Sequence, residues 1–429
     1  MKVEALAITS TDQKGQASAS AAVATRRLEE LLRFGGLMLS AGDTAFRVRR
    51  SLGMIARGMG FVALSVQLGS RNLVASVWRD GETATLVRDV DVPCVNTERI
   101  GALEALARNM LGMPSSAFAA ELAAIESARP RYSIVQTAAA IGVACGAFAF
   151  LNGGVWPDVA ACAIGGGIGQ GLRSFLHRRH FNQYAVTALT ALVASGVYCV
   201  ASGIAIRAGF GLGRNSIGLI SSVLFLVPGF PLVTALLDQL QHETAAAVSR
   251  LAYAVMFLLT AAVGLSVVIT LVGFSVEGSP QPTFAKPLML VLWALASFCG
   301  ACGFAILYNG TWSNVLHVGL VAIIGNEIRL TLHSSGLALP LAILIGAFAV
   351  GLTASLVGRW IKEARVALTV PGVIMMVPGL YAFETLVYFN QGEIFKALAA
   401  GVLVGFAVGA IAFGLAAARF ISEPEWLRE

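Results

Sequence analysis

Four charged side chains lie within the long apolar stretches of this sequence, at Asp158, Glu327, Arg329 and Glu384. Burying one charge in a bilayer costs about 2.5–3.5 kcal/mol on insertion scales, so each of them needs a partner or a water-filled path. Such groups can bind a zwitterion, because its carboxylate needs a cation and its ammonium group needs an acceptor. We expect Arg329 to bind a substrate carboxylate and Glu384 or Glu327 to bind an ammonium group.

The same carboxyl groups are candidates for carrying a coupled proton, and Asp158 joins Glu327 and Glu384 in this role. A simpler alternative is open for Asp158 and Arg329. Both lie near the ends of apolar stretches, where charged side chains serve as interfacial anchors. Glu384 is the stronger candidate for a functional role, because it follows Pro378, which interrupts its stretch, by six residues.

The apolar part of the chain contains three Val-Pro-Gly motifs, and two of them occupy equivalent places in its two halves. The third, at 370–372, lies seven residues before the motif of the second half and is expected to loosen the same stretch again. "LVPGFP" contains Pro228 and Gly229, and "MVPGLY" contains Pro378 and Gly379. Proline removes a backbone donor and glycine weakens a helix, so each motif predicts an interruption whose free backbone groups line a cavity. We predict substrate contacts at these four residues and at Thr234, five residues after Gly229. The alternative is a pair of proline kinks that serve packing alone.

The composition places these motifs in a membrane. Of 429 residues, 57% are hydrophobic and 13% are charged, against about 25% charged in a typical soluble protein. The mean hydropathy is +0.76. Residues 1–131 have the composition of a soluble segment, whereas 133–418 is almost continuously apolar. We therefore predict an α-helical polytopic membrane protein preceded by a small α+β domain.

Several other classes of protein are disfavoured. The net charge of +6 comes largely from arginines beside apolar stretches, which argues for membrane orientation and against a nucleic-acid partner. No Walker motif is present, and no cofactor is predicted. Cys299 and Cys302 lack a second pair, so close helix packing explains them better than a metal site. "GGGIGQG" at 165–171 follows no strand and is also predicted to be a helix contact.

The first part of the chain divides into a tail and a domain. Residues 1–22 are predicted to be a disordered tail, and 23–131 a cytosolic α+β domain. Two amphipathic helices ending at Gly42 and Gly60 precede three alternating segments, which predict a meander of strands. A further helix is expected to begin at Asn96, because asparagine is a good N-cap.

The apolar region contains ten stretches long enough to cross a bilayer, which takes about 20 residues each. They are 133–151, 155–172, 184–206, 216–237, 251–273, 287–308, 313–332, 337–357, 366–389 and 397–418. Residues 132–274 and 287–420 would then each form a five-helix transmembrane repeat.

Basic residues between these stretches and at their ends predict the orientation. Eleven fall on the side of the N-terminal domain and five on the other, which places both termini in the cytoplasm. The eleven are Arg129, Arg131, Arg173, Arg178, Arg179, Arg250, Arg359, Lys362, Arg365, Arg419 and Arg428. The five are Arg207, Arg214, Lys286, Arg329 and Lys396.

The two halves of the apolar region match each other. With "NGGVW" aligned to "NGTW", an offset of 156 pairs Trp156 with Trp312, Gly169 with Gly325 and Arg173 with Arg329. At the two motifs the offset is 150, which pairs Pro228 with Pro378 and Thr234 with Glu384. Because each half has an odd number of spans, the second must be inverted, as in many secondary transporters. Such folds bind substrate between the halves, at interrupted helices.

Four polar residues outside the stretches are assigned no part in the site. Asp238, His242 and Glu243 follow the fourth stretch and are expected at a solvated helix end, although they could receive substrate or protons. Asp43, in "SAGDT", is expected to cap a helix and not to catalyse.

The order of a soluble domain, ten spans and a Pro-Gly break late in each half resembles the threonine/serine exporter family. "FGGLMLSAGDTAFRVRRSLGMIARGMGF" resembles the opening of that family's domain, and the resemblance runs from about Leu28 to about Ala418. It implies an inner-membrane exporter of small hydroxy amino acids driven by the proton gradient. Some relatives are split into two chains that match the two halves. The residues that carry over are Gly42, Pro228, Gly229, Pro378 and Gly379.

We therefore expect an antiporter of the cell inner membrane that exports threonine or serine by alternating access, with the N-terminal domain gating entry. Its partners would be the small-molecule substrate, protons and the lipid bilayer, and a homo-oligomer is left open. An exporter or channel for small carboxylates such as dicarboxylic acids is the alternative. A membrane-embedded hydrolase is a weaker one, because no nucleophile–base pair can be located.

Overall fold

The computed structural model describes residues 24–69, 71–79, 82–210, 216–273, 284–361 and 363–423. The chain divides into two compact units. Unit 1 is Met1–Arg129 with His242–Ser249, and unit 2 is Pro130–Gln241 with Arg250–Glu429. The predicted tail at 1–22 lies outside the described residues, as do Arg214, Lys362 and Arg428. Nothing in the sequence indicated that 242–249 would join unit 1.

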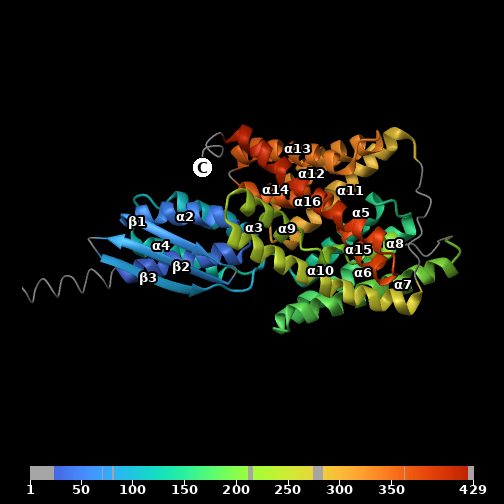
Figure 1. Ribbon diagram of the computed structural model, residues 1–429, viewed down its shortest axis with the longest axis horizontal. Coiled ribbons are helices and arrows are strands. Elements are labelled where there is room, and N and C mark those ends of the chain that lie inside the picture. The colour runs from blue at the N-terminus through green and yellow to red at the C-terminus, as the bar shows by residue number, and fades with distance from the viewer. Residues whose placement is uncertain are drawn as a thin grey trace, which may run out of the picture. The chain divides into compact units, whose positions relative to one another are not determined.

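Unit 1 contains a three-stranded antiparallel sheet in the order β1-β2-β3, which is the predicted meander (Figure 1). The strands are β1 (Ala63–Leu68), β2 (Asn72–Arg79) and β3 (Glu82–Asp89). Leu73, Ala75 and Val77 alternate along β2 and are buried on one face of the sheet. On the other face Ser76 pairs with Thr85 across β2 and β3, and their hydroxyl oxygens are 2.7 Å apart. The alternation of apolar and polar residues thus produces a sheet with one buried face.

Four helices form one hydrophobic core with the buried face of this sheet. They are a helix over residues 24–40, α2 (Ala45–Gly58), α3 (Thr97–Arg108) and α4 (Ser115–Ser127). The first packs closely on β2, since a methyl group at Gly35 would lie 2.7 Å from Leu73 Cδ2. Gly42 and Gly60 follow the first two helices with φ of +92° and +81°, a conformation that glycine adopts without strain. The Asn96 side chain accepts the Arg99 N–H at the start of α3, as predicted.

Unit 2 is built from helices throughout its described part. In the first half these are α5 (Ile134–Leu151), α6 (Trp156–Arg178), α7 (Gln183–Arg207), α8 (Ser216–Ser221), the 3₁₀ turn η1 (Leu224–Leu226), α9 (Gly229–Leu240) and α10 (Thr244–Val272), whose first residues belong to unit 1. In the second half they are α11 (Lys286–Leu307), α12 (Trp312–Ser334), α13 (Leu339–Ile361), α14 (Arg365–Val373), η2 (Ile374–Met376), α15 (Gly379–Asn390) and α16 (Ile394–Ser422). Helices α5 and α11 pack against each other in unit 2 (Figure 1).

Seven helices among the described residues are long and apolar enough to cross a membrane: α5, α7, α10, α11, α12, α13 and α16. An eighth span results if α14–η2 and α15 are counted together, although they are bent by 46° at their junction. The predicted spans 155–172 and 216–237 fall on α6 and on α8 to α9. These do not meet the same test, because α6 carries several glycines and charged groups and the other segment is divided. The chain is thus a helical multi-pass membrane protein.

Small residues bring the helices of unit 2 into close contact. A methyl group at Gly165 on α6 would lie 2.6 Å from the Ala194 carbonyl oxygen on α7. One at Gly142 on α5 would lie 2.6 Å from the Ala163 carbonyl oxygen on α6. The glycine-rich run at 165–171 therefore serves helix packing, as predicted, since backbones can approach this closely only where side chains are absent.

Candidate functional site

The Val-Pro-Gly motifs at 227–229 and 377–379 interrupt their helices with the same backbone geometry. The third motif, at 370–372, does not interrupt its helix, because Pro371 lies inside α14. Val227 and Val377 leave the helical region, with ψ of 121° and 126°. Pro228 and Pro378 follow with φ of −78° and ψ of 60° and 52°. In each motif the glycine N–H donates to the valine carbonyl at 2.8 Å, which closes an inverse γ-turn around the proline. A new helix then begins at the glycine. Each of these two motifs therefore ends one helix and starts another, which a simple proline kink would not do.

The two breaks lie against each other inside unit 2. A methyl group at Gly229 would come 2.5 Å from Ile374 Cδ1 and 3.4 Å from Val377 Cγ2. A methyl group at Gly379 would come 2.8 Å from Leu224 Cδ2 and 3.1 Å from Val227 Cγ2. Each glycine thus faces the valine of the other motif. Segments about 150 residues apart in the sequence meet where two helices are interrupted.

A small cavity lies beside the second break. Its volume is about 30 Å³, room for about two water molecules, so an amino acid can enter only if the walls move. The walls come from both halves of unit 2, on α5, η1, α12, α13 and the second break. The polar side chains among them belong to Asn152, Arg329 and Tyr381, and Pro378 lies between them in the wall.

Arg329 is held in place from one side. Its Nε donates to Asn326 Oδ1 at 2.8 Å, and Asn326 Nδ2 donates to Ser297 Oγ at 2.6 Å. The Ser297 hydroxyl in turn donates to the Trp293 carbonyl at 2.7 Å. No carboxylate of the described residues lies within 4 Å of the guanidinium, whose remaining nitrogens are available to an anion. The arginine predicted to bind a substrate carboxylate therefore lines the cavity at the break.

Glu384 lies on α15 behind the same break and is half-buried. Among the described residues it makes no hydrogen bond or ion pair. Tyr381, one turn earlier on α15, is close enough to both Arg329 and Glu384 to interact with their charges. Glu384 does not line the cavity itself, whereas Tyr381 does, so Glu384 lies one turn of α15 away from the cavity wall.

The other two charged candidates lie apart from the cavity. Asp158 is fully buried and accepts the Tyr198 hydroxyl at 2.8 Å, which joins α6 to α7. Glu327 is two residues from Arg329 on α12, so it points away from that side chain. Its Oε1 is buried and has no hydrogen-bond partner among the described residues. Of the four charged residues that lie within the apolar stretches, Arg329 alone lines this cavity.

Thr234, the counterpart of Glu384, belongs to a polar cluster that sequence reasoning missed. Its hydroxyl donates to the Phe230 carbonyl at 2.9 Å and accepts from Arg250 Nη1 at 3.1 Å. Arg250 Nε also lies 3.4 Å from Asp238 Oδ2. The expectation of a solvated end at Asp238 is wrong, because this side chain is 0% exposed. The available signal was an acid and a base flanking the short connection between two apolar stretches.

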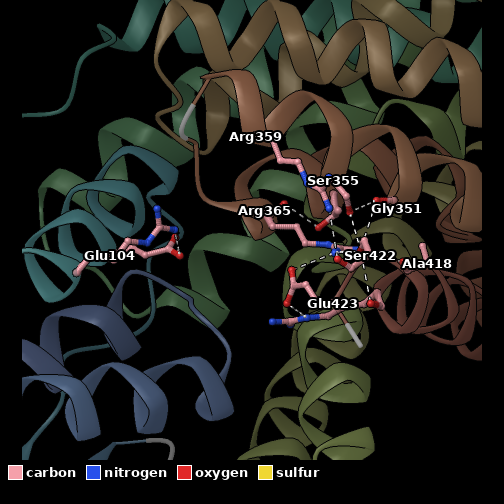
Figure 2. Close-up of polar contacts among 11 residues, drawn as sticks. Glu104, Gly351, Ser355, Arg359, Arg365, Ala418, Ser422 and Glu423 are labelled. Atoms are coloured by element: carbon pink, nitrogen blue, oxygen red, sulfur yellow. Dashed lines mark hydrogen bonds and ion pairs between the residues drawn. The ribbon is translucent and has the colours of Figure 1, made fainter. Parts of the chain in front are cut away.

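The start of α14 is fixed by a separate network, which Figure 2 shows around Arg365. Arg365 Nη1 donates to Ser422 Oγ at 2.7 Å and to Glu423 Oε1 at 3.2 Å, and Nη2 donates to the Gly351 carbonyl at 3.3 Å. Arg419 also donates to Glu423, at 3.0 Å. Burial disfavours ionisation of Glu423, but Arg419 and Arg365 outweigh it and lower the pKa of that carboxyl. The network ties α14, which leads into the second break, to α13 and α16.

Unit 1 contains a buried ion-pair cluster at the start of α2. Asp43 is 0% exposed, accepts the Thr44 N–H at 2.8 Å and lies 2.9 Å from Arg47, which also contacts Glu104 at 2.8 Å. Burial raises the pKa of Asp43, which Arg47 only partly offsets. The N-cap residue of α2 is Thr44 and not Asp43, which lies one position earlier and accepts the Thr44 N–H. Its contacts are those of a structural group.

Two family models match this chain. One described as "Putative threonine/serine exporter" matches residues 29–272, and one described as "Threonine/Serine exporter, ThrE" matches 293–421. The first match ends at the last residue of α10, and the second begins within α11.

Three relatives illustrate the range of similar proteins. A "Probable threonine/serine exporter" of Mycobacterium tuberculosis is 24% identical over 391 residues, which are 86% of this chain and 71% of that protein. A "Threonine/serine exporter" of Corynebacterium glutamicum is 22% identical over 399 residues, 88% of this chain and 80% of the relative. A "Probable succinate transporter subunit YjjP" of Escherichia coli is 24% identical over 243 residues, 56% of this chain and 92% of the relative. No solved structure matches.

Proposed function

The chain belongs to the threonine/serine exporter family, and we propose that it is a secondary transporter that carries threonine, serine or a similar small hydroxy amino acid out of the cell. It would act in the inner membrane, with both termini in the cytoplasm. The family and the apolar helices support an amino acid exporter of the membrane.

In this proposal the membrane part consists of two inverted halves of five spans each. Helices α6 and α8 to α9 then lie in the membrane with the others, which gives ten spans. The matching breaks support this arrangement, because each glycine faces the valine of the other motif. Phe148 and Phe304, which the offset of 156 pairs, also stack edge to face with ring centroids 5.8 Å apart. Such self-contacts are expected near a pseudo-twofold axis.

Substrate would bind where the breaks meet the cavity. The observation that carries the proposal is the Arg329 guanidinium, which lines the cavity beside the Pro378 break. It would bind the substrate carboxylate, with Pro228, Gly229, Pro378 and Gly379 shaping the site and Thr234 lying deeper along α9. The start of α15 adds the positive end of a helix dipole at the same place.

Glu384 would hold the ammonium group or carry the coupled proton. A half-buried carboxyl that lacks a hydrogen-bond partner among the described residues is suited to both roles. Glu327 is a second proton carrier in this scheme, because its Oε1 is buried. Asp158 would serve less directly, because Tyr198 already donates to it. Proton entry from outside would then be exchanged for substrate release.

The test is transport by the purified chain in lipid vesicles. Vesicles loaded with unlabelled threonine should accumulate labelled threonine by exchange, and a pH gradient should drive net flux in the opposite direction to proton movement. A channel would show no stimulation by internal substrate. A hydrolase would alter the label chemically.

A small dicarboxylate is the second candidate substrate. The relative named as a succinate transporter subunit supports it, as does an arginine without an acidic neighbour in the cavity wall. Labelled succinate and labelled threonine, presented to the same vesicles, separate the two substrates. Exchange of succinate without exchange of threonine would replace the first proposal with the second.

A further inference from the structure

A second set of charged groups lies on the first half of unit 2, apart from the cavity. Thr234 and Asp238 on α9 are both 0% exposed, and the Arg250 side chain on α10 is 14% exposed. Arg250 reaches both of them, with Nη1 3.1 Å from Thr234 Oγ1 and Nε 3.4 Å from Asp238 Oδ2. One cation, one anion and one hydroxyl are thus gathered in a buried place.

Burial of this pair is not explained by stability. Removing two charges from water costs more than their mutual attraction commonly returns, and apolar residues of the same size often stabilise a protein better. The same residues in the second half show that the fold does not need the pair, because the offset of 150 puts Tyr388 at the place of Asp238 and Ala400 at the place of Arg250. A function is therefore the better reason for these charges.

The position of the cluster connects it to the first break. Helix α9 begins at Gly229, and the Thr234 hydroxyl donates to the carbonyl of Phe230, in the first turn after the break. Asp238 lies one further turn along the same helix. The cluster therefore lines the length of α9 that leads away from the break, as Glu384 does on the equivalent helix α15.

We propose that Thr234, Asp238 and Arg250 form a second binding site, selective for zwitterionic hydroxy amino acids. This inference rests on the proposed function. Without substrate the aspartate and the arginine close on each other. Substrate separates them: its carboxylate binds Arg250, its ammonium group binds Asp238, and its hydroxyl pairs with Thr234. The two charges remain satisfied in both states, which is the condition for burying them.

The site would also make the transporter selective for one of the two candidate substrates. A dicarboxylate offers Arg250 a partner but places its second negative charge near Asp238, where repulsion opposes binding. An amino acid satisfies both groups. The cavity at Arg329 accepts any carboxylate, so the selectivity for amino acids would come from α9 and α10.

The test is equilibrium binding to the purified full-length chain, with threonine and three analogues that each lack one group. Threonine methyl ester lacks the carboxylate, 3-hydroxybutyrate lacks the ammonium group, and 2-aminobutyrate lacks the hydroxyl. Asp238→Asn should lower the affinity for threonine and its ester about tenfold or more and leave the affinity for 3-hydroxybutyrate unchanged. Arg250→Gln should weaken threonine and 3-hydroxybutyrate and spare the ester. Thr234→Val should weaken threonine and spare 2-aminobutyrate.

A structural role predicts a different pattern. If the residues are only structural, each variant would lower the affinity for all four ligands by the same factor or would change none of them. Either result overturns the proposal. The exchanged pair Asp238→Arg with Arg250→Asp keeps an ion pair and should recover thermal stability without recovering threonine affinity. If it recovers both, the pair is structural. Failure of the wild-type chain to bind threonine at all would instead overturn the proposed function, and this inference with it.

Discussion

At the scale of single residues, the membrane part contrasts charges that are paired with charges that are not. Glu384 has no hydrogen-bond or ion-pair partner among the described residues. Glu393, nine residues later, lies 3.4 Å from Lys396, and its side chain is 51% exposed. Glu384→Gln keeps the size of the side chain and removes its charge and its proton. We expect gradient-driven export to fall about tenfold or more, equivalent to about 1.4 kcal/mol or more of lost coupling.

The measurement is threonine flux in vesicles with and without a pH gradient. Glu393→Gln is the matched control and should transport normally, because its partner is an exposed lysine. Export by the Glu384→Gln protein that responds fully to the gradient would remove this residue from the mechanism.

Arg47 in unit 1 provides a residue-scale prediction about stability. It is 11% exposed and contacts both the fully buried Asp43 and Glu104. Arg47→Met would leave Asp43 as a buried charge without its cation, and breaking such a pair costs about 3–5 kcal/mol. We expect amide hydrogens of α2 and α3 to exchange much faster in the full-length variant.

Arg26 supplies the comparison for this variant. Its side chain is 82% exposed and 3.9 Å from Glu30, so Arg26→Met should leave amide exchange nearly unchanged. Equal exchange rates in the two variants would mean that the Asp43–Arg47 pair contributes little to the folding of unit 1.

At the scale of elements, local signals predicted what local physics controls. The strand alternation, the asparagine at the start of α3 and the glycines after the first two helices act over a few residues, so they were readable. Asp238 was misplaced because its burial depends on Arg250, which lies twelve residues away beyond a helix connection. Membership of 242–249 in unit 1 is likewise a tertiary contact that no local pattern encodes.

The second break gives the element-scale prediction. Pro378→Ala with Gly379→Ala restores a backbone donor and two good helix formers, and the new methyl group at 379 would lie 2.8 Å from Leu224 Cδ2. We expect the initial rate of threonine exchange to fall about tenfold, which corresponds to about 1.4 kcal/mol at the barrier. Exchange in vesicles measures this effect.

Pro287→Ala is the control for losing a proline. Pro287 lies in the first turn of α11, where a proline's missing N–H has no helical partner, so its loss should have little effect. If the double variant at the break also exchanges threonine normally, the interruption is a packing feature only.

At the scale of the whole molecule, aligning the two halves of the apolar sequence identified two distant segments that meet in the structure. Matching Pro228 with Pro378 predicted two equivalent breaks, and the structure has two breaks of equal geometry in mutual contact. The offset could not predict which charges reach the cavity. Arg329 lines it because Asn326 and the fold of α12 direct the guanidinium there, and Asp158 does not because Tyr198 binds it elsewhere. Side-chain direction depends on partners from other helices, which a sequence offset does not contain.

Contact between the halves yields the prediction at this scale. If transport requires one half to move against the other, fixing the two breaks together should stop it. A Cβ at Gly379 would lie 3.7 Å from Val227 Cβ, within the 3.5–4.5 Å that a disulfide spans. Val227→Cys with Gly379→Cys should therefore form a crosslink on oxidation, abolish threonine exchange, and recover it on reduction.

Each single cysteine variant, treated with the same oxidant, separates the crosslink from the substitutions themselves and from oxidation of the native thiols. Both should retain the exchange rate that they have before oxidation, because neither can join the breaks. Mass spectrometry of the linked peptides establishes that the bond has formed. A linked protein that still exchanges threonine at the rate of its reduced form would show that the breaks stay together throughout the cycle, and motion of the halves at this contact would then have to be abandoned as the basis of transport.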